Sequence, residues 1–265
     1  MYAFSYHRPA SVAEAVKILK ASSDGRCLAG GMSLIPTMKH RLASASDLID
    51  LNGIGELGGI RREGDALVIG ALARHVEIAD SAEVRKAIPA LAALAGSVGD
   101  PQVRNRGTFS GSLCFADPAA DCPAGLVGLN GTVITDKRRI PADQFFKGLY
   151  ETALEKGEIV TGVSFPIPEK AGWAKFANLA SRYAIVAVMA AKTGGQVRVA
   201  VTGAKASVFR VPEMEAALGK SFAPTALESI KLSAAGMNSD LHGDAEYRAN
   251  LVSVMAKRAV QAASS

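Results

Sequence analysis

Two glycine-rich segments could each bind an anionic group through exposed backbone N–H groups. The first is Ala29-Gly30-Gly31-Met32-Ser33, and the second is Arg106-Gly107-Thr108-Phe109-Ser110-Gly111-Ser112. Glycine lets a ligand approach the backbone, a helix N-terminus supplies positive potential, and the hydroxyls of Ser33, Thr108 and Ser112 can donate to phosphate oxygens. One Gly-Gly pair alone is more often a tight turn. Two such segments together predict a site for one diphosphate.

Two carboxylates follow the second glycine segment in the same stretch of chain. Asp117 and Asp121 are placed where a carboxylate could accept hydrogen bonds from ribose hydroxyls, although one of the two could merely cap a turn. The stretch from Gly99 to Asp121 has no helical or strand period, so we expect a long loop there. Such loops inside compact chains are more often functional than idle.

A third glycine-rich segment matches the dinucleotide-binding fingerprint by spacing alone. Gly53-Ile-Gly55-Glu-Leu-Gly58 follows an expected strand, but the fingerprint must also open a helix. Here the chain continues into an expected β-hairpin with its turn at Glu63-Gly64-Asp65. We therefore interpret this segment as a glycine turn and reject a Rossmann domain.

Other reactive residue types form no recognisable constellation. The four histidines, His7, His40, His75 and His242, are scattered without metal-ligand spacing. The three cysteines suit neither a disulfide framework nor a zinc or iron–sulfur site, and no nucleophile motif is present. A bound cofactor would therefore have to carry any redox reaction.

Periodicity places these segments on expected helices and strands. A capping box at Ser11 to Glu14 starts a helix over 12–20, and a short strand at 26–29 precedes a helix over 34–42. The further expected elements are a strand at 47–51, a hairpin of 59–62 and 66–72, helices over 75–88 and 89–98, strands at 131–135 and 158–165, a hairpin of 184–191 and 196–202, and helices over 212–219, 226–235 and 246–263.

Length and composition describe an ordinary globular chain. With 265 residues, two domains are expected, and Pro166 and Pro168 place a boundary near that point. The net charge of +5 is spread over interspersed residues, which argues against nucleic-acid binding. The N-terminal residues lack the apolar core of a signal peptide, and no stretch is long and apolar enough for a membrane span, so we expect a cytoplasmic protein.

The motifs resemble those of a known family. Residues 29–36 (Ala-Gly-Gly-Met-Ser-Leu-Ile-Pro), 99–121 and 175–184 resemble the medium, FAD-binding subunit of molybdenum hydroxylases of the aerobic carbon monoxide dehydrogenase type. The resemblance spans nearly the whole chain. It implies an α+β fold: a vanillyl-alcohol-oxidase-type (PCMH-like) FAD-binding domain over 1–168, with subdomains of about 1–56 and 57–168. A C-terminal α+β domain with an antiparallel sheet and helices would follow over 169–265.

The resemblance also implies a set of site residues for noncovalently bound FAD. By motif position, Ala29 to Ser33 and Gly107, Thr108, Gly111 and Ser112 would hold the diphosphate. Asp121 would bind a sugar hydroxyl, and Asp117 stays a second candidate from its place in the same stretch of chain. Val160 would lie near the adenine, and Lys175 and Tyr183 would approach the flavin.

The family's division of labour implies that this chain transfers electrons and does not oxidise the substrate. A large subunit with the molybdenum cofactor would oxidise the substrate, and a small subunit with 2Fe-2S clusters would pass electrons to this FAD for an external acceptor. We expect a dimer of such heterotrimers. The substrate, whether carbon monoxide, a purine, an aldehyde or an N-heterocycle, is not encoded here.

Two other functions remain open from the residues. One is a free-standing FAD-dependent oxidoreductase of the same fold, which would need its own catalytic base, and the other is a non-enzymatic nucleotide-binding module. Two positions depart from the family pattern: Ser110 stands where a glycine is common, and Leu179 where a proline is common. If the turn at Ser110 required positive φ, the strain there would cost about 1–2 kcal/mol.

Overall fold

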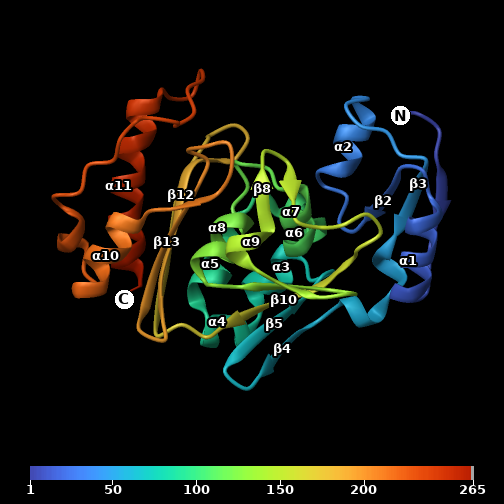
Figure 1. The fold of residues 1–265 in the computed structure, drawn as a ribbon, viewed down its shortest axis with the longest axis horizontal. Coiled ribbons are helices and arrows are strands. Elements are labelled where there is room, and N and C mark those ends of the chain that lie inside the picture. The colour runs from blue at the N-terminus through green and yellow to red at the C-terminus, as the bar shows by residue number, and fades with distance from the viewer. Residues whose placement is uncertain (264–265) are drawn as a thin grey trace.

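The computed structural model describes residues 1–263 and contains three main sheets in a row, running from the N-terminus at one end of the molecule to the C-terminus at the other (Figure 1). We call them the N-terminal sheet (order β1-β3-β2), the middle sheet (β4-β5-β10-β6-β7) and the C-terminal sheet (β11-β12-β13-β14). Strands β8 and β9 form a separate two-stranded ribbon. The mixture of helices and largely antiparallel sheets agrees with the expected α+β class.

The N-terminal sheet is parallel, and its connections carry the first glycine segment. Its elements are β1 (Ser5–His7), α1 (Val12–Ala21), β2 (Gly25–Leu28), α2 (Leu34–Lys39) and β3 (Asp47–Asp50). Helix α1 confirms the capping-box prediction, because the Ser11 side chain accepts a hydrogen bond from the Glu14 N–H. Helix α2 ends before the expected Leu42, and Arg41 adopts a left-handed φ of 58°.

The middle sheet is antiparallel and is covered by several short helices. Its elements, with the ribbon, are η1 (Leu51–Gly53), η2 (Gly55–Leu57), β4 (Ile60–Glu63), β5 (Ala66–Gly70), α3 (His75–Asp80), α4 (Ala82–Ala87), α5 (Pro89–Ser97), α6 (Pro101–Arg106), α7 (Phe109–Phe115), α8 (Cys122–Gly128), β6 (Thr132–Thr135), β7 (Arg139–Pro141), α9 (Ala142–Phe145), β8 (Phe146–Gly148), β9 (Glu151–Thr152) and β10 (Val160–Pro166). The fingerprint-like segment forms the two 3-10 turns and then enters the β4–β5 hairpin, as expected.

The expectation of a loop from Gly99 to Asp121 was wrong, because the chain folds there into α6 and α7. Each helix begins at a side-chain cap: Asp100 accepts from the Val103 N–H, and Thr108 accepts from the Gly111 N–H. Helices of six and seven residues are too short to show a hydrophobic period in the sequence. The single helix expected over 75–88 is two helices, α3 and α4. Ser81 ends the first and caps the second.

The C-terminal sheet is antiparallel and lies between helices. Its elements are β11 (Lys170–Ala177), β12 (Ala184–Thr193), β13 (Gln196–Thr202), β14 (Phe209–Arg210), α10 (Pro212–Lys220), η3 (Pro224–Leu227) and α11 (Ala245–Ala262). The expected hairpin is confirmed as β12–β13, and its turn uses Gly194 and Gly195 at positive φ. The helix expected over 226–235 was wrong: only η3 forms, and Leu227 and Ile230 pack against the C-terminal core without a continuous helix.

Two hydrophobic cores flank the C-terminal sheet. One face packs against α10 and α11, while Trp173, Ala187 and Met189 on the other face join the core of the middle sheet and its helices. Figure 1 shows this sheet between the red helices and the green helices. Gly172 allows α11 to approach closely, because a Cβ there would overlap the Ala259 carbonyl. The shared core fixes the C-terminal sheet against the rest of the molecule.

Candidate functional site

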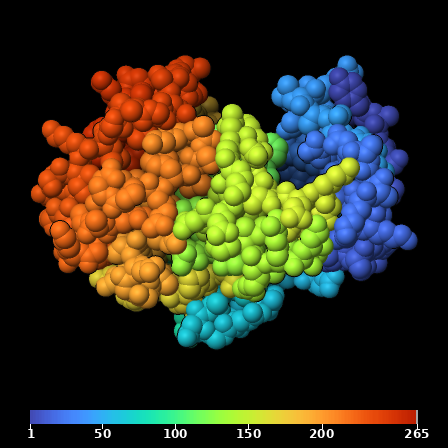
Figure 2. All heavy atoms as spheres, viewed as in Figure 1, coloured from blue at the N-terminus to red at the C-terminus, as the bar shows by residue number. Residues whose placement is uncertain are grey.

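A cavity of about 440 Å³ lies where the N-terminal sheet, the helices of the middle sheet and the C-terminal sheet meet. Figure 2 shows the surface hollowed between the blue N-terminal residues and the green and yellow residues. The predicted site residues that line this cavity are Ala29, Gly30, Gly31, Met32, Ser33, Gly107, Thr108, Gly111, Ser112, Asp121, Val160, Lys175 and Tyr183. The fold therefore brings together residues that are up to about 150 positions apart in the chain.

The first glycine segment packs directly on the second. A Cβ at Gly30 would overlap the Arg106 carbonyl and lie 2.8 Å from the Gly107 Cα. Gly31 has a φ of +76°, a conformation that favours glycine. Ser33 makes no side-chain capping bond at the start of α2, so its hydroxyl is available to a ligand. The two segments form one continuous wall of the cavity.

The second glycine segment is organised by Thr108. Its Oγ1 accepts a hydrogen bond from the Gly111 N–H at 3.1 Å, which caps α7 and leaves the hydroxyl proton free to donate. A Cβ at Gly111 would lie 2.6 Å from Thr108 Oγ1 and 3.8 Å from the Ala29 Cβ. The absence of a side chain at Gly111 keeps this wall open toward the first segment.

A buried ion pair forms another side of the cavity. Lys175 Nζ donates to Asp121 Oδ2 at 2.6 Å and to the Ser97 carbonyl at 3.1 Å. Asp121 Oδ1 has no hydrogen-bond partner in the described part of the chain. Burial raises the pKa of Asp121 to about 6, although Lys175 acts in the opposite direction. A ligand that donates a hydrogen bond to Oδ1 would therefore meet an unsatisfied acceptor.

The C-terminal sheet holds the loop that carries Asp121. Thr202 Oγ1 lies 2.8 Å from the Pro118 carbonyl and 2.7 Å from the Ala120 carbonyl, and the Gly203 N–H donates to Pro118 at 2.8 Å. These contacts fix the loop between α7 and α8 from the far side. The position of Asp121 thus depends on β13 as well as on its own helix.

Asp117 is the one predicted site residue that does not line the cavity. Its Oδ1 accepts from the Ala119 N–H at 2.8 Å, and its Oδ2 lies 3.5 Å from the Tyr150 hydroxyl. The carboxylate therefore caps a turn, as expected for one of the two aspartates. Of the two predicted aspartates, Asp121 is the one that the fold brings to the cavity.

Tyr183 stands at the cavity rim after a tight turn. The Asn178 N–H donates to the Tyr183 carbonyl, and the intervening Arg182 adopts a left-handed φ of 63°. Burial raises the pKa of the Tyr183 hydroxyl to about 12, so the phenol is protonated at neutral pH. Val160, by contrast, is buried at the start of β10.

Comparison with known proteins identifies the family. Residues 2–168 match the model of the FAD binding domain in molybdopterin dehydrogenase. The chain belongs to this family. It is 38% identical to the carbon monoxide dehydrogenase medium chain of Hydrogenophaga pseudoflava (98% of this chain, 96% of the other) and 37% identical to the nicotine 6-hydroxylase medium subunit of Paenarthrobacter nicotinovorans (97% and 96%).

A solved structure of this family confirms the fold. The chain superimposes on a chain of the reconstituted CO dehydrogenase from Oligotropha carboxidovorans with a TM-score of 0.91, at 34% identity, covering 99% of this chain and 98% of the other. The expected PCMH-like α+β fold and membership of an oxidoreductase family are therefore confirmed. None of the described helices has the length and apolar character required to cross a membrane.

Both departures from the family pattern are accommodated. Ser110 lies in the first turn of α7 with helical backbone, so the strain considered for a positive φ does not arise. Leu179 is 90% exposed in the turn before Tyr183 and contacts no core. Ser110 lines the cavity, whereas Leu179 does not.

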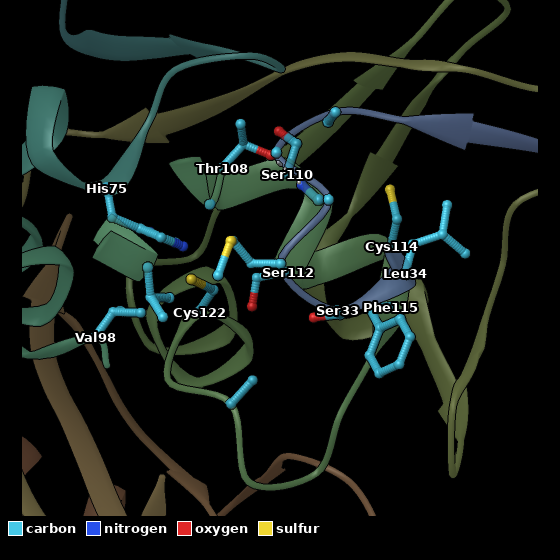
Figure 3. Close-up of a pocket in the computed structure, with 18 of the residues that line it drawn as sticks. Ser33, Leu34, His75, Val98, Thr108, Ser110, Ser112, Cys114, Phe115 and Cys122 are labelled. Carbon is cyan, nitrogen blue, oxygen red and sulfur yellow. Dashed lines mark hydrogen bonds between the residues drawn. The ribbon is translucent and has the colours of Figure 1, made fainter. Parts of the chain in front are cut away.

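Sequence reasoning did not assign several polar residues of the cavity to the site, among them His75 and Ser110. Figure 3 shows the His75 ring extending from the start of α3 toward the pocket, with Ser110 and Thr108 on a neighbouring wall. His75 Nδ1 and Ser110 Oγ have no hydrogen-bond partner among residues 1–263. Burial lowers the pKa of His75 to about 4, and nearby Arg104 adds to this effect, so the imidazole is neutral at pH 7. His75 carries no sequence signal beyond its place after the β5 strand.

Proposed function

We propose that this chain is the FAD-binding electron-transfer subunit of a molybdenum hydroxylase complex. It would take electrons from 2Fe-2S clusters of a small partner subunit and pass them to an external acceptor, while a large subunit with the molybdenum cofactor oxidises the substrate. The observation that carries the proposal is the meeting of both glycine segments in one cavity, in a chain of a FAD-binding family.

The residues present fit FAD. Backbone N–H groups of Ala29 to Ser33, with the hydroxyls of Ser33, Thr108 and Ser112, would hold the diphosphate, and Gly111 would leave room for it. The unpartnered Oδ1 of Asp121 would accept from a sugar hydroxyl. Val160 would contact the adenine, and Lys175 and Tyr183 would face the flavin. Bound flavin accepts one or two electrons, which suits a link between single-electron clusters and a two-electron acceptor.

Noncovalent binding of FAD remains a prediction, and the side chains of the cavity give a reason to test it. His75 and the thiols of Cys27, Cys114 and Cys122 line the cavity, so groups capable of a covalent link are within it. We expect denaturation of the holoprotein to release all of its flavin absorbance into solution. Colour that stays on the precipitated polypeptide would contradict noncovalent binding.

The substrate is proposed to be determined by the partners. The two relatives named for carbon monoxide and for nicotine resemble this chain almost equally, at 38% and 37% identity. Since their named substrates share little chemistry, the medium subunit is a poor source of substrate specificity. The expected assembly is a dimer of heterotrimers, each with one large, one medium and one small subunit.

Subunit omission tests the electron-transfer role. The complex assembled with this chain should reduce its acceptor when substrate is added, whereas the large and small subunits alone should reduce their clusters but not the acceptor. Full acceptor reduction without this chain would contradict the proposal. A free-standing oxidoreductase would instead turn over its substrate without partners, and a non-enzymatic module would show no flavin absorbance after purification.

A further inference from the structure

His75 and Ser110 are buried polar side chains that line the cavity without a hydrogen-bond partner. They are 3% and 2% exposed, respectively. Most buried polar groups in folded proteins are paired, because an unpaired donor or acceptor has lost its water without a replacement. Two unpaired groups at one cavity therefore point to a ligand that supplies the missing bonds.

Ser110 belongs to the second glycine segment, and His75 is held against that segment by backbone contacts. The His75 N–H donates to the Gly107 carbonyl at 3.0 Å, and Arg74 forms a β-bridge with Thr108. Ser110 follows two residues after Thr108, in the first turn of α7. The two side chains thus lie beside the same wall that is expected to meet the diphosphate.

The chemistry of the two groups is complementary to the central part of a flavin dinucleotide. A serine hydroxyl donates and accepts and can rotate toward a ligand, and a neutral imidazole offers one donor and one acceptor. The phosphates of FAD present acceptor oxygens, and its ribityl chain presents hydroxyls. The His75 ring lies beside Gly107, where a Cβ would be 3.3 Å from Nε2, and the charge that acts on the imidazole is that of Arg104.

We propose that the side chains of His75 and Ser110 bind the phosphate–ribityl portion of FAD, in addition to the glycine backbone and the hydroxyls of Thr108 and Ser112. The proposal rests on the FAD-binding function proposed above. Both side chains would then help to hold the cofactor. Without the cofactor, their unpaired polar groups would lower the thermal stability of the protein.

Substitution of each residue should have opposite effects on the empty and the loaded protein. In the full-length chain, Ser110→Ala and His75→Phe should each raise the Kd for FAD by about 3- to 10-fold, the loss expected for one hydrogen bond. Without FAD, the same variants should keep or raise the thermal midpoint, because an unpaired buried polar group has been removed. Fluorescence titration with FAD and thermal unfolding with and without FAD measure both effects.

Matched controls separate binding from folding. Ser44→Ala and His40→Phe change exposed residues outside the cavity and should alter neither measurement. His75→Gln, which keeps a donor and an acceptor, should bind FAD more tightly than His75→Phe. If His75→Phe misfolds, Ser110→Ala alone decides by the same criteria.

A purely structural role would lower the thermal midpoint of the empty and the loaded protein alike, and this would overturn the proposal. So would Kd values for Ser110→Ala and His75→Phe within twofold of the unsubstituted chain. If the unsubstituted chain itself fails to bind FAD, the proposed function falls and this inference falls with it. If the unsubstituted chain binds FAD and the variants bind it equally well, only this inference falls and the proposed function stands.

Discussion

Gly111 and Gly55 both lie in glycine-rich segments but have very different environments. Gly111 lines the cavity, where a Cβ would lie 2.6 Å from Thr108 Oγ1, whereas a Cβ at Gly55 would meet nothing within 4 Å. We predict that Gly111→Val weakens FAD binding on the order of 100-fold or more, about 2.7 kcal/mol, because the branched side chain fills the approach to the backbone. Gly55→Val should bind FAD normally. Titration with FAD measures both, and circular dichroism verifies folding.

The reverse ranking of these two variants would contradict the assignment of the second glycine segment to the diphosphate. Gly31→Val is a less decisive test, because the positive φ of Gly31 would strain any side chain and could disturb the fold.

Lys175 and Asp121 form a buried ion pair in which each charge compensates the other. Their side chains are only 6% and 4% exposed, so Lys175→Met would leave a buried carboxylate without its cation. We predict a loss of about 3–5 kcal/mol in the free energy of unfolding at pH 8. The pKa of Asp121, already raised to about 6, would rise further, and a group with a raised folded-state pKa loses its stabilising contribution as pH rises through that pKa.

The destabilisation by Lys175→Met should therefore be smaller at pH 5 than at pH 8. Denaturant unfolding at the two pH values measures the difference. An equal loss at both would mean that the charge of Asp121 does not determine the effect, and Lys175→Met in an Asp121→Asn background serves as the matched control.

At the residue scale, the sequence predicted residues of the candidate site only where they belong to a recognisable motif. Thr108, Gly111 and Asp121 lie in recognisable strings, and the fold brings all three to the cavity. His75 and Ser110 were missed because burial without a partner is a property of the folded cavity, invisible in a single sequence.

At the element scale, the start of β10 is fastened by a charged network beside the cavity. Arg138 Nε donates to Glu158 Oε1 at 2.9 Å, and the Thr135 hydroxyl donates to the same oxygen at 2.8 Å. The hydrogen bond from Arg138 is the main reason why the pKa of Glu158 falls from 4.5 to about 2. Glu158 also lines the cavity, two residues before Val160.

This network predicts a defined acid sensitivity. A carboxylate with a lowered folded-state pKa contributes stability that is present above 4.5 and is lost as pH falls toward about 2. Glu158→Gln should therefore be less stable than the unsubstituted chain at pH 7 and should lose less stability between pH 5 and pH 2. Urea unfolding across this range measures both slopes, and parallel slopes would contradict the role of Glu158.

Elements with a strong local signal were predicted correctly, and those defined by tertiary contacts were not. The capping box of α1 and the Gly194-Gly195 hairpin are local signals. Helices α6 and α7 are short and depend on side-chain caps, while β11 is defined by its pairing with β12 and by the close approach of α11 at Gly172. Such elements arise from packing that a single sequence does not reveal.

At the scale of the whole molecule, the cavity exists only because three sheets meet. Ala29 comes from the N-terminal sheet, Thr108 and Asp121 from the helices of the middle sheet, and Lys175 from β11. The shared core around Trp173 and Met189 holds the last of these walls in place. The division into domains at 168 and 169, with a further division near 56, stays a prediction.

The most direct test of the account is anaerobic reduction of the bound FAD by the physiological substrate. In the complex reconstituted with the molybdenum and iron–sulfur partners, the flavin absorbance near 450 nm should bleach when substrate is added, because electrons can reach this cavity through the clusters. The isolated chain loaded with FAD should stay oxidised under the same conditions. Bleaching of the isolated chain, or reduced clusters beside an oxidised flavin in the complex, would contradict the electron-transfer role.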